Sequence, residues 1–483
     1  MEEKELDQVK QRKEKVKKLK SLGIDPYPYK FETTNSIKDI RNNFERYEGK
    51  EVSSCGRLVS KRIHGKAGFS HIEDMSGKIQ VYFKYDTLGE KFDIVKLIDI
   101  GDFIGVKGKV FKTHTGEVTI WVKHLEILAK SIHPLPEKWH GLKDIELRYR
   151  YRYLDLIANP KVKEIFIKRS LIIDIIREFF KGNGFLEVET PILQPVYGGA
   201  FAKPFKTYHN VLNRELYLRI ADELYLKRLI IGGFERVFEI GKDFRNEGVD
   251  RFHNPEFTML EAYCAYCDYF DIMELVENLF LKLANVTCDS DYIDYQGNHI
   301  SFRTPWQRIP YFEALKKYTD VDFYSLDYEK TKNKANKLGV DVKEKLSRGK
   351  ILEAIFDKFV QPNLVQPTFI IDYPRDISPL AKEKRGDKNL VERFEPFVSA
   401  FEIGNAYSEL NDPIEQRKRF EEQMKMRKKG DFETESFDKD FLNALSYGMP
   451  PTGGLGIGID RIIMLFTDAP SIRDVILFPQ LKE

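Results

Sequence analysis

Between residues 51 and 130 the chain passes through five short segments rich in strand-forming residues, and this pattern constrains the fold more than any other. Apolar and polar side chains alternate clearly in the third segment, where Ile79, Val81 and Phe83 share one face. A helix-like segment, TLGEKFDIVKLID, separates the third strand segment from the fourth. Five strands with a helix in this place are the arrangement of an OB-fold barrel, which commonly binds single-stranded nucleic acid. The sequence therefore predicts an OB-fold domain over residues 51–132.

The remainder of the chain predicts a larger second domain. A length of 483 residues suits one small and one large domain, or about three of average size. The segment HPLPEKWHGL, with two prolines and a glycine, indicates a linker, which we place at residues 133–150. We expect residues 1–50 to form a basic helical extension, and residues 151–483 to form one domain with a helical insertion near 320–360.

The charge balance limits any binding of nucleic acid to local surfaces. Lysine and arginine number 78 against 76 acidic residues, so the formal net charge is only +2. Residues 10–20 carry seven basic side chains against one acid, Glu14, and read as an exposed helix. Such a run is typical of a solvated face, with contact to a phosphate backbone as the alternative. The segment LRYRYRYLDL likewise suits either an interdomain or subunit contact or an RNA-binding stripe.

Several features predict a cytoplasmic protein. Four cysteines in so long a chain do not form a disulfide scaffold and suit a reducing compartment. The first residues, MEEKELDQVK, are charged and acidic, which is unlike a signal or transit peptide. No stretch approaches the roughly 18 apolar residues of a membrane span. We therefore expect no membrane association.

Residues 244–263, FRNEGVDRFHNPEFTMLEAY, gather side chains that suit a nucleotide site. Read as a strand, a loop and a second strand, the segment places Arg245 and Glu247 on one side of the first strand. On the second strand, Phe257, Glu261 and Tyr263 share a face because their numbers differ by two or four. An internal ion pair would explain the arginine and one glutamate alone. The convergence of all five groups favours a ligand site with a phosphate-binding guanidinium and a stacking ring.

Residues 392–412, ERFEPFVSAFEIGNAYSELND, form a second candidate cluster. Asn405, Tyr407 and Glu409 lie on one face of a predicted strand. Glu395 and Glu402 are seven apart, so they converge only if the chain turns between them, near residues 398–400. Paired carboxylates suit Mg²⁺, which shares oxygen ligands with substrate phosphates, and two solvated acids are the alternative.

Two further motifs are less specific on their own. In GGLGIGIDRII, residues 453–463, glycines allow a ligand to approach the backbone and Arg461 enters the next helix, but neither glycine-rich nucleotide fingerprint is present. Cys264 and Cys267 have the spacing of a redox or zinc motif, but no second pair completes a zinc site. Their opposite strand parity predicts opposite faces, so we interpret them as packing residues.

Together these segments resemble the class II aminoacyl-tRNA synthetases and, within them, the lysyl-tRNA synthetases. GFLEVETP, with Pro191, is similar to the family's first motif, which lies at the dimer interface. FRNEG through HNPEFT is similar to the second motif, and GIGIDR, ending in Arg461, to the third. The resemblance implies an α+β protein: an N-terminal five-stranded OB-fold barrel that binds the anticodon, and a catalytic domain built on an antiparallel β-sheet flanked by helices.

The resemblance also implies the reaction and its residues. The family activates L-lysine with ATP to lysyl-adenylate, transfers lysine to the 3′ end of tRNA(Lys), works as a homodimer and uses Mg²⁺. By resemblance, the catalytic residues are Arg245 and Arg461. Those implied for ATP are Arg245, Glu247, His253, Asn254, Phe257 and Arg461. Those implied for lysine are Gly199, Glu223, Glu261, Tyr263, Asn405, Tyr407 and Glu409. Glu395 and Glu402 are implied for Mg²⁺, and Arg62, Phe69, Gln80 and Glu117 for a U-rich anticodon. Asp222 departs from the family, which usually has proline there.

Three alternatives remain open from the sequence. An aspartyl- or asparaginyl-tRNA synthetase shares the barrel and the three motifs, but needs a cationic or amide-reading pocket where this chain has Glu261 and Glu409. An enzyme that transfers lysine to a protein does not need residues 51–130. A non-catalytic RNA-binding module does not need Arg245, Arg461 and the paired glutamates together.

Overall fold

The computed structural model describes residues 2–135, 144–342, 346–428 and 437–482. The chain divides into two compact units, Met1–Lys143 and Asp144–Glu483. The expected linker at 133–150 falls partly outside the described residues, and its last six residues form helix α6 (Ile145–Arg150). No helix in the described parts of the chain combines the length and apolar character that crossing a membrane requires.

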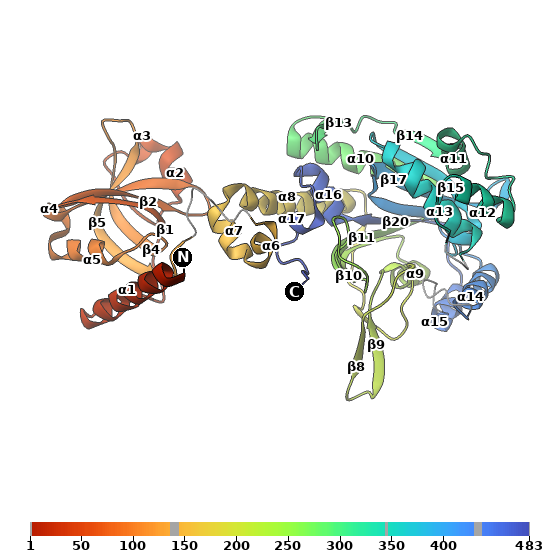
Figure 1. Cartoon of the computed structure of the whole chain (residues 1–483), viewed down its shortest axis with the longest axis horizontal. Coiled ribbons are helices and arrows are strands. Elements are labelled where there is room, and N and C mark those ends of the chain that lie inside the picture. The colour runs from red at the N-terminus through yellow and green to blue at the C-terminus, as the bar shows by residue number, and fades with distance from the viewer. Residues whose placement is uncertain (1, 136–143, 343–345, 429–436, 483) are drawn as a thin grey trace. The chain divides into compact units, whose positions relative to one another are not determined.

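The first unit contains a closed five-stranded barrel in the order β1-β2-β3-β5-β4 (Figure 1). Its strands are β1 (Glu51–His64), β2 (Ala67–Glu73), β3 (Lys78–Lys84), β4 (Phe103–Lys112) and β5 (Val118–Ala129). Strands β3 and β5 pair in parallel, and the other neighbours are antiparallel. Helices α4 (Tyr85–Leu88) and α5 (Phe92–Leu97) lie between β3 and β4 in the chain. The predicted OB-fold arrangement is confirmed.

The alternation in β3 fills the centre of the barrel. Ile79, Val81 and Phe83 are at most 1% exposed, whereas Gln80 and Tyr82 on the other face are partly accessible. Strand β3 therefore contributes β-branched and aromatic side chains to the barrel core, as strand packing favours.

Three helices precede the barrel strands: α1 (Glu2–Ser21), α2 (Ile37–Asn42) and α3 (Phe44–Tyr47). Helix α1 is fixed to the unit because Leu19 is fully buried. Arg12 donates a hydrogen bond of 2.9 Å to the carbonyl of Ser131, and Lys15 forms an ion pair of 2.5 Å with Asp99. Two of the basic residues therefore anchor the helix, while Lys10, Lys13, Lys17, Lys18 and Lys20 remain exposed.

The second unit is built on a ten-stranded sheet whose main path is β14-β15-β17-β19-β20-β11-β10-β6 (Figure 1). From β15 to β10 all neighbours are antiparallel, as predicted. Both edges, β14 with β15 and β10 with β6, pair in parallel, so the sheet is mixed. The bounds of the strands on this path are β6 (Leu186–Glu187), β10 (Arg236–Phe244), β11 (Glu256–Ala265), β14 (Gln307–Pro310), β15 (Thr368–Pro374), β17 (Asp387–Val398), β19 (Gly404–Ser408) and β20 (Thr452–Gly458).

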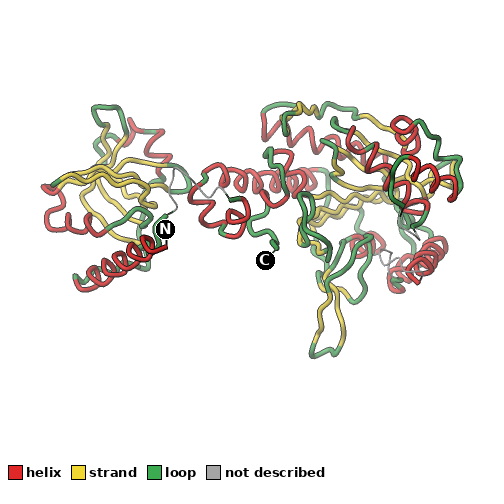
Figure 2. The backbone as a smooth tube through the Cα atoms, viewed as in Figure 1, coloured by secondary structure: helices red, strands yellow, loops and turns green. Residues whose placement is uncertain are grey.

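The remaining strands are short. Strands β16 (Glu383–Lys384) and β18 (Phe401–Glu402) pair with β17, and β12 (Tyr292–Tyr295) pairs with β13 (Asn298–Ser301). A third sheet contains β7 (Leu193–Gln194), β9 (Arg214–Leu218) and β8 (Lys206–His209). The β8–β9 hairpin projects from the body of the unit (Figure 2).

Helices cover the large sheet and contribute side chains to three apolar clusters. Their bounds are α7 (Arg152–Ala158), α8 (Pro160–Gly182), α9 (Glu223–Ile231), α10 (Tyr269–Cys288), α11 (Tyr311–Thr319), α12 (Tyr328–Lys337), α13 (Arg348–Phe359), α14 (Pro413–Lys428), α15 (Lys439–Leu445), α16 (Ile459–Phe466) and α17 (Ile472–Val475). The largest cluster lies between the sheet and helices α8, α10 and α16. A second cluster joins α11, α12 and α13 to β15 and β17, and a third contains residues of α9, α14 and α15. In its described parts, the region near 320–360 contains the two helices α12 and α13, joined by loops.

Candidate active site

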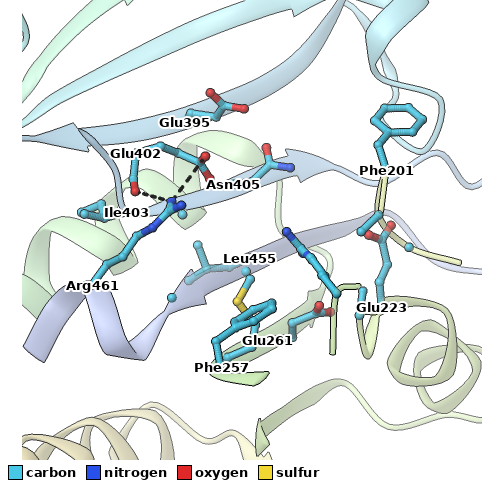
Figure 3. A pocket seen from close by; sticks show the side chains of 18 of the residues that line it. Phe201, Glu223, Phe257, Glu261, Glu395, Glu402, Ile403, Asn405, Leu455 and Arg461 are labelled. Carbon is cyan, nitrogen blue, oxygen red and sulfur yellow. Dashed lines mark hydrogen bonds and ion pairs between the residues drawn. The ribbon is translucent and has the colours of Figure 1, made fainter. Parts of the chain in front are cut away.

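A cavity of about 350 Å³ opens over the centre of the ten-stranded sheet. Its size is in the range of small-ligand sites. It contains every residue that the sequence analysis assigned to ATP, lysine or Mg²⁺: Gly199, Glu223, Arg245, Glu247, His253, Asn254, Phe257, Glu261, Tyr263, Glu395, Glu402, Asn405, Tyr407, Glu409 and Arg461. Segments that are 200 residues apart in the chain therefore meet at one place (Figure 3).

Strand β11 supplies one wall of the cavity. Phe257, Glu261 and Tyr263 line it together, as their common parity predicted. Glu261 pairs across the sheet with Gly456 of β20, and Tyr263 pairs with Gly454. A Cβ atom at Gly454 would lie only 1.8 Å from Oε1 of Glu409, so the glycine is needed for the glutamate to enter the cavity.

Arg245 and Glu247 do not lie on a strand, contrary to the prediction. Strand β10 ends at Phe244, and both residues follow it in the connection to β11. The amide of Arg245 donates to the carbonyl of Pro255 over 2.9 Å, and its guanidinium carbon lies 5.0 Å from the centre of the Phe257 ring. Arg245 therefore faces the cavity because the loop that carries it is fixed, and not because of its position in a strand.

The same loop holds His253 and Asn254. His253 Nδ1 lies 2.8 Å from Oδ2 of Asp250, and Asn254 donates to the carbonyl of Glu256 over 2.5 Å. These contacts fix both side chains, which line the cavity together with Phe257.

Glu395 and Glu402 converge through the turn that the sequence requires. Ser399 and Ala400 both have positive φ, at 54° and 66°, and β18 pairs back on β17 with Glu402 opposite Phe397. Arg461 donates 2.6 Å to the carbonyl of Glu402 and lies 3.5 Å from its carboxylate (Figure 3). Two carboxylates and one guanidinium thus lie at the same end of the cavity.

Glu395 is more enclosed than Glu402. It accepts a hydrogen bond of 2.6 Å from Tyr373 and forms an ion pair of 2.5 Å with Arg393. Burial raises the pKa of Glu395, and the positive charge of Arg393 partly opposes this shift. No group of three or more His, Cys, Asp or Glu side chains in the described residues is arranged to hold a metal. Two oxygen donors beside an open cavity nevertheless fit Mg²⁺, which takes its other ligands from phosphate and water.

The opposite end of the cavity holds three buried carboxylates and a buried ammonium. Glu223, Glu261 and Glu409 are at most 4% exposed. Lys227, which is fully buried, pairs with both Glu223 and Glu409. Tyr407 donates 3.1 Å to Glu223, and Tyr263 donates 3.0 Å to Glu261. The cluster carries more acidic groups than basic ones.

Burial sets the protonation of this cluster. Loss of hydration raises the pKa of Glu409 to about 8, with Glu223 adding to the shift and Lys227 opposing it. Burial likewise raises the pKa of Glu261, with the nearby Asp243 and Glu223 carboxylates. Burial opposes the charge of Lys227, but its two carboxylate partners outweigh burial and raise its pKa. The ammonium therefore stays charged, whereas Glu409, one of its two partners, holds its proton more tightly than usual.

Asp222, the departure from the family pattern, lies behind Glu261. Its amide donates 3.2 Å to Glu261, and its carboxylate shares Arg219 with Glu239 and Asp243. Burial, together with Asp243 and Glu261, raises the pKa of Asp222 to about 11. A protonated Asp222 adds no charge to the cluster.

Sequence reasoning missed two charged residues of the cavity region, Lys227 and Arg393. Lys227 follows Glu223 by four residues on α9, so helical spacing alone brings the two side chains together. Arg393 precedes Glu395 by two residues on β17, which puts both on one face. Its Nε donates 2.9 Å to Oδ1 of Asn405. Both residues could therefore have been predicted from the sequence, by their spacing from Glu223 and Glu395.

The barrel carries a separate candidate surface. Phe69 is 39% exposed, with its ring centre 4.7 Å from that of Tyr82. Gln80 donates 2.7 Å to Glu117. A groove on this face is lined by Arg62, Phe69 and Gln80. Glu117 lies next to the groove, where it accepts the hydrogen bond from Gln80. An exposed ring beside polar and basic side chains is suited to stacking with a base.

Comparison with known proteins agrees with both units. Residues 144–482 match the model of tRNA synthetases class II (D, K and N), and residues 52–128 match the model of an OB-fold nucleic acid binding domain. The lysine–tRNA ligase of Thermoanaerobacter pseudethanolicus is 54% identical over 98% of this chain and 95% of its own length. That of Carboxydothermus hydrogenoformans is 54% identical over 100% of this chain and 99% of its own. That of Moorella thermoacetica is 52% identical, with 99% of each chain covered. The chain therefore belongs to the class II tRNA synthetases (D, K and N) and, within them, to the lysine–tRNA ligases.

Proposed function

We propose that this chain activates L-lysine with ATP and transfers it to tRNA(Lys). The observation that carries the proposal is the excess of buried acid at one end of the cavity. Three buried acids accompany a single ammonium there, which leaves two acids to pair with a substrate that carries two ammonium groups. A buried carboxylate left unpaired is costly, so a neutral side chain would be rejected strongly.

Lysine lies with its ε-ammonium toward Glu409 and Tyr263, and its α-ammonium toward Glu223 and Gly199. Glu261, Asn405 and Tyr407 complete the pocket. An aspartate or asparagine substrate would place no positive side chain against Glu409. The buried ammonium of Lys227 is already paired with two acids. This charge pattern favours lysine over the other substrates of the family.

ATP occupies the other end of the cavity. Its adenine stacks on Phe257, with Glu247, His253 and Asn254 beside it, and Arg461 covers the other face and reaches the γ-phosphate. Arg245 holds the α-phosphate and the lysine carboxylate. The carboxylate is already ionised and attacks the α-phosphorus in line, so the residues position the reactants and stabilise charge without a general base.

Glu395 and Glu402 would hold Mg²⁺, which would supply positive charge against the phosphates of ATP. Tyr373 and Arg393 orient Glu395, and Arg461 fixes the backbone of Glu402.

The barrel reads the anticodon. Phe69 stacks on a base, and Arg62, Gln80 and Glu117 reach base edges or phosphate. The exposed lysines of α1 add attraction to the tRNA backbone that depends on salt and not on sequence.

A second copy of the chain completes a homodimer in the cytoplasm. Support comes from exposed apolar side chains: on α8, Ile167 and Leu171 are 50% and 46% exposed, and at the start of β7, Ile192 and Leu193 are 43% and 48% exposed. A surface of this kind suits an isologous contact. All four cysteines are free thiols, which suits a reducing compartment. A fully active monomer in sedimentation at assay concentration would contradict the dimer.

The deciding experiment is pyrophosphate exchange with each of lysine, aspartate and asparagine, followed by charging of tRNA. We expect exchange with lysine alone and charging of tRNA(Lys). Exchange with aspartate or asparagine would refute the substrate assignment. Lysine exchange without tRNA charging would indicate the protein-modifying alternative, and no exchange would leave only an RNA-binding role.

A further inference from the structure

Cys264 and Cys267 lie in contact, although strand parity predicted opposite faces. The prediction was wrong because β11 ends at Ala265 and the chain turns back at Tyr266, which has a φ of 63°. This turn brings the two sulfur atoms to 2.6 Å, whereas a disulfide bond measures about 2.05 Å. A covalent bond between them therefore requires only a small further approach.

The two thiols have different surroundings. Cys264 is only 3% exposed and packs in the largest apolar cluster, whereas Cys267 is partly accessible. A hydrogen bond from the Cys264 thiol lowers the pKa of Cys267 against the effect of burial. The same hydrogen bond, together with burial, raises the pKa of Cys264. Cys267 is therefore the accessible sulfur with more thiolate character, and Cys264 lies in position to resolve an adduct on it.

The turn that joins the two cysteines is held at both ends. The amide of Tyr266 donates 2.5 Å to the carbonyl of Pro451, and Asp268 caps helix α10. Asp268 also forms an ion pair of 2.7 Å with Arg385. Because the backbone on each side is fixed, the short distance between the sulfur atoms is built into the fold.

We propose that Cys264 and Cys267 are a reversible dithiol site, oxidised to an intramolecular disulfide by low-molecular-weight disulfides. The Cys267 thiolate attacks the reagent disulfide, forms a mixed disulfide and releases one reagent thiolate. The Cys264 thiol loses its proton to solvent and attacks the Cys267 sulfur, which releases the second reagent thiolate. Two electrons pass from the protein to the reagent, and one disulfide replaces another. The proposal concerns the thiols alone and does not depend on the proposed function.

The test is to treat the reduced full-length protein with glutathione disulfide, alkylate the remaining thiols and map the peptides by mass. We expect a Cys264–Cys267 disulfide, loss of two of the four thiols from titration, and full recovery with dithiothreitol. Cys288→Ala is the matched control, because this exposed cysteine lies outside the pair and its loss should leave the disulfide unchanged.

Two variants separate the steps. Cys264→Ala should retain a mixed glutathione disulfide on Cys267, because the resolving thiol is gone, and Cys267→Ala should form no disulfide at Cys264. Thermal unfolding of each reduced variant shows that it is folded before treatment. The proposal is overturned if native wild-type protein is glutathionylated at Cys288 or Cys55 while Cys264 and Cys267 both remain reduced. Equal adduct lifetimes on Cys267 in wild type and Cys264→Ala would also overturn it.

Discussion

Replacement of Lys227 by methionine tests the electrostatic reading of the acidic cluster. The side chain is fully buried and its ammonium pairs with Glu223 and Glu409, so methionine keeps most of the volume and removes the charge. Removal of one partner of a buried ion pair costs about 3–5 kcal/mol, because the other partner is left uncompensated. That is a large share of the roughly 5–15 kcal/mol by which a domain is stable.

The pH dependence of this loss follows from Glu409. Its pKa in the folded protein is raised to about 8, and we expect removal of Lys227 to raise it further. A raised folded pKa means that the native state binds more protons than the unfolded state, so stability falls as pH rises from about 4.5 toward 8. Folded Glu409 then differs in protonation between wild type and Lys227→Met only above about pH 8, so the defect of the variant should be smallest at pH 5 and should grow as pH rises above 8.

Hydrogen exchange in urea, followed on peptides of α9 and β11, measures the effect where it arises. The control is Lys316→Met, an exposed residue of α11, which should change stability by less than about 0.5 kcal/mol. The double variant with Glu409→Gln should recover part of the loss, because an unpaired acid is removed. Equal stability of Lys227→Met and Lys316→Met at pH 9 would refute the reasoning.

Three further predictions concern activity. In exchange assays, Glu409→Gln should raise the KM for lysine by the equivalent of about 2–5 kcal/mol and leave the KM for ATP nearly unchanged. An unchanged lysine dependence would mean that Glu409 is not the acid that pairs with the substrate side chain. Phe69→Ala should reduce charging of tRNA(Lys) by about one to two orders of magnitude, since stacking contributes about 1–3 kcal/mol per base, while pyrophosphate exchange is retained; loss of both would assign the ring to folding. The KM for lysine should fall as pH rises from 6.5 to 8.5, because Glu409, with a pKa of about 8 in the empty pocket, must ionise to pair with an ammonium; a flat profile, or the same slope in Glu409→Gln, would contradict this.

The parts of the site that follow from strand parity were predictable, and the parts that depend on where a strand ends were not. Phe257, Glu261 and Tyr263 line the cavity together because β11 is regular through all three. Arg245 lies beyond the end of β10, and Cys267 beyond the end of β11, so parity assigned both incorrectly. The β10–β11 ladder ends where Arg245 lies opposite Pro255, because proline has no N–H to continue the pairing, and the register that brings these two residues together is a tertiary feature.

The turn between Glu395 and Glu402 was predicted from the chemistry of a shared ligand, although strand parity alone places the two residues on opposite faces. Parity alone separates the two residues, but a shared ligand requires them to meet, and the chain does turn through Ser399 and Ala400 in the left-handed region. Neither residue is a glycine, so the local sequence gives no sign of positive φ, which asparagine, aspartate or glycine would have signalled. The need for two carboxylates at one ligand thus predicted a turn that the residue types in this segment do not predict.

Charge balance connects the buried residues to the choice of substrate. Burial raises the pKa of Glu261 and of Glu409, so the empty pocket favours protons on these two acids. A substrate that brings two ammonium groups replaces those protons with fixed positive charge. A neutral or acidic side chain leaves Glu409 protonated or unpaired and gains nothing from it. Lys227 thus sets how many charges the substrate must supply, and the acids set where it must supply them.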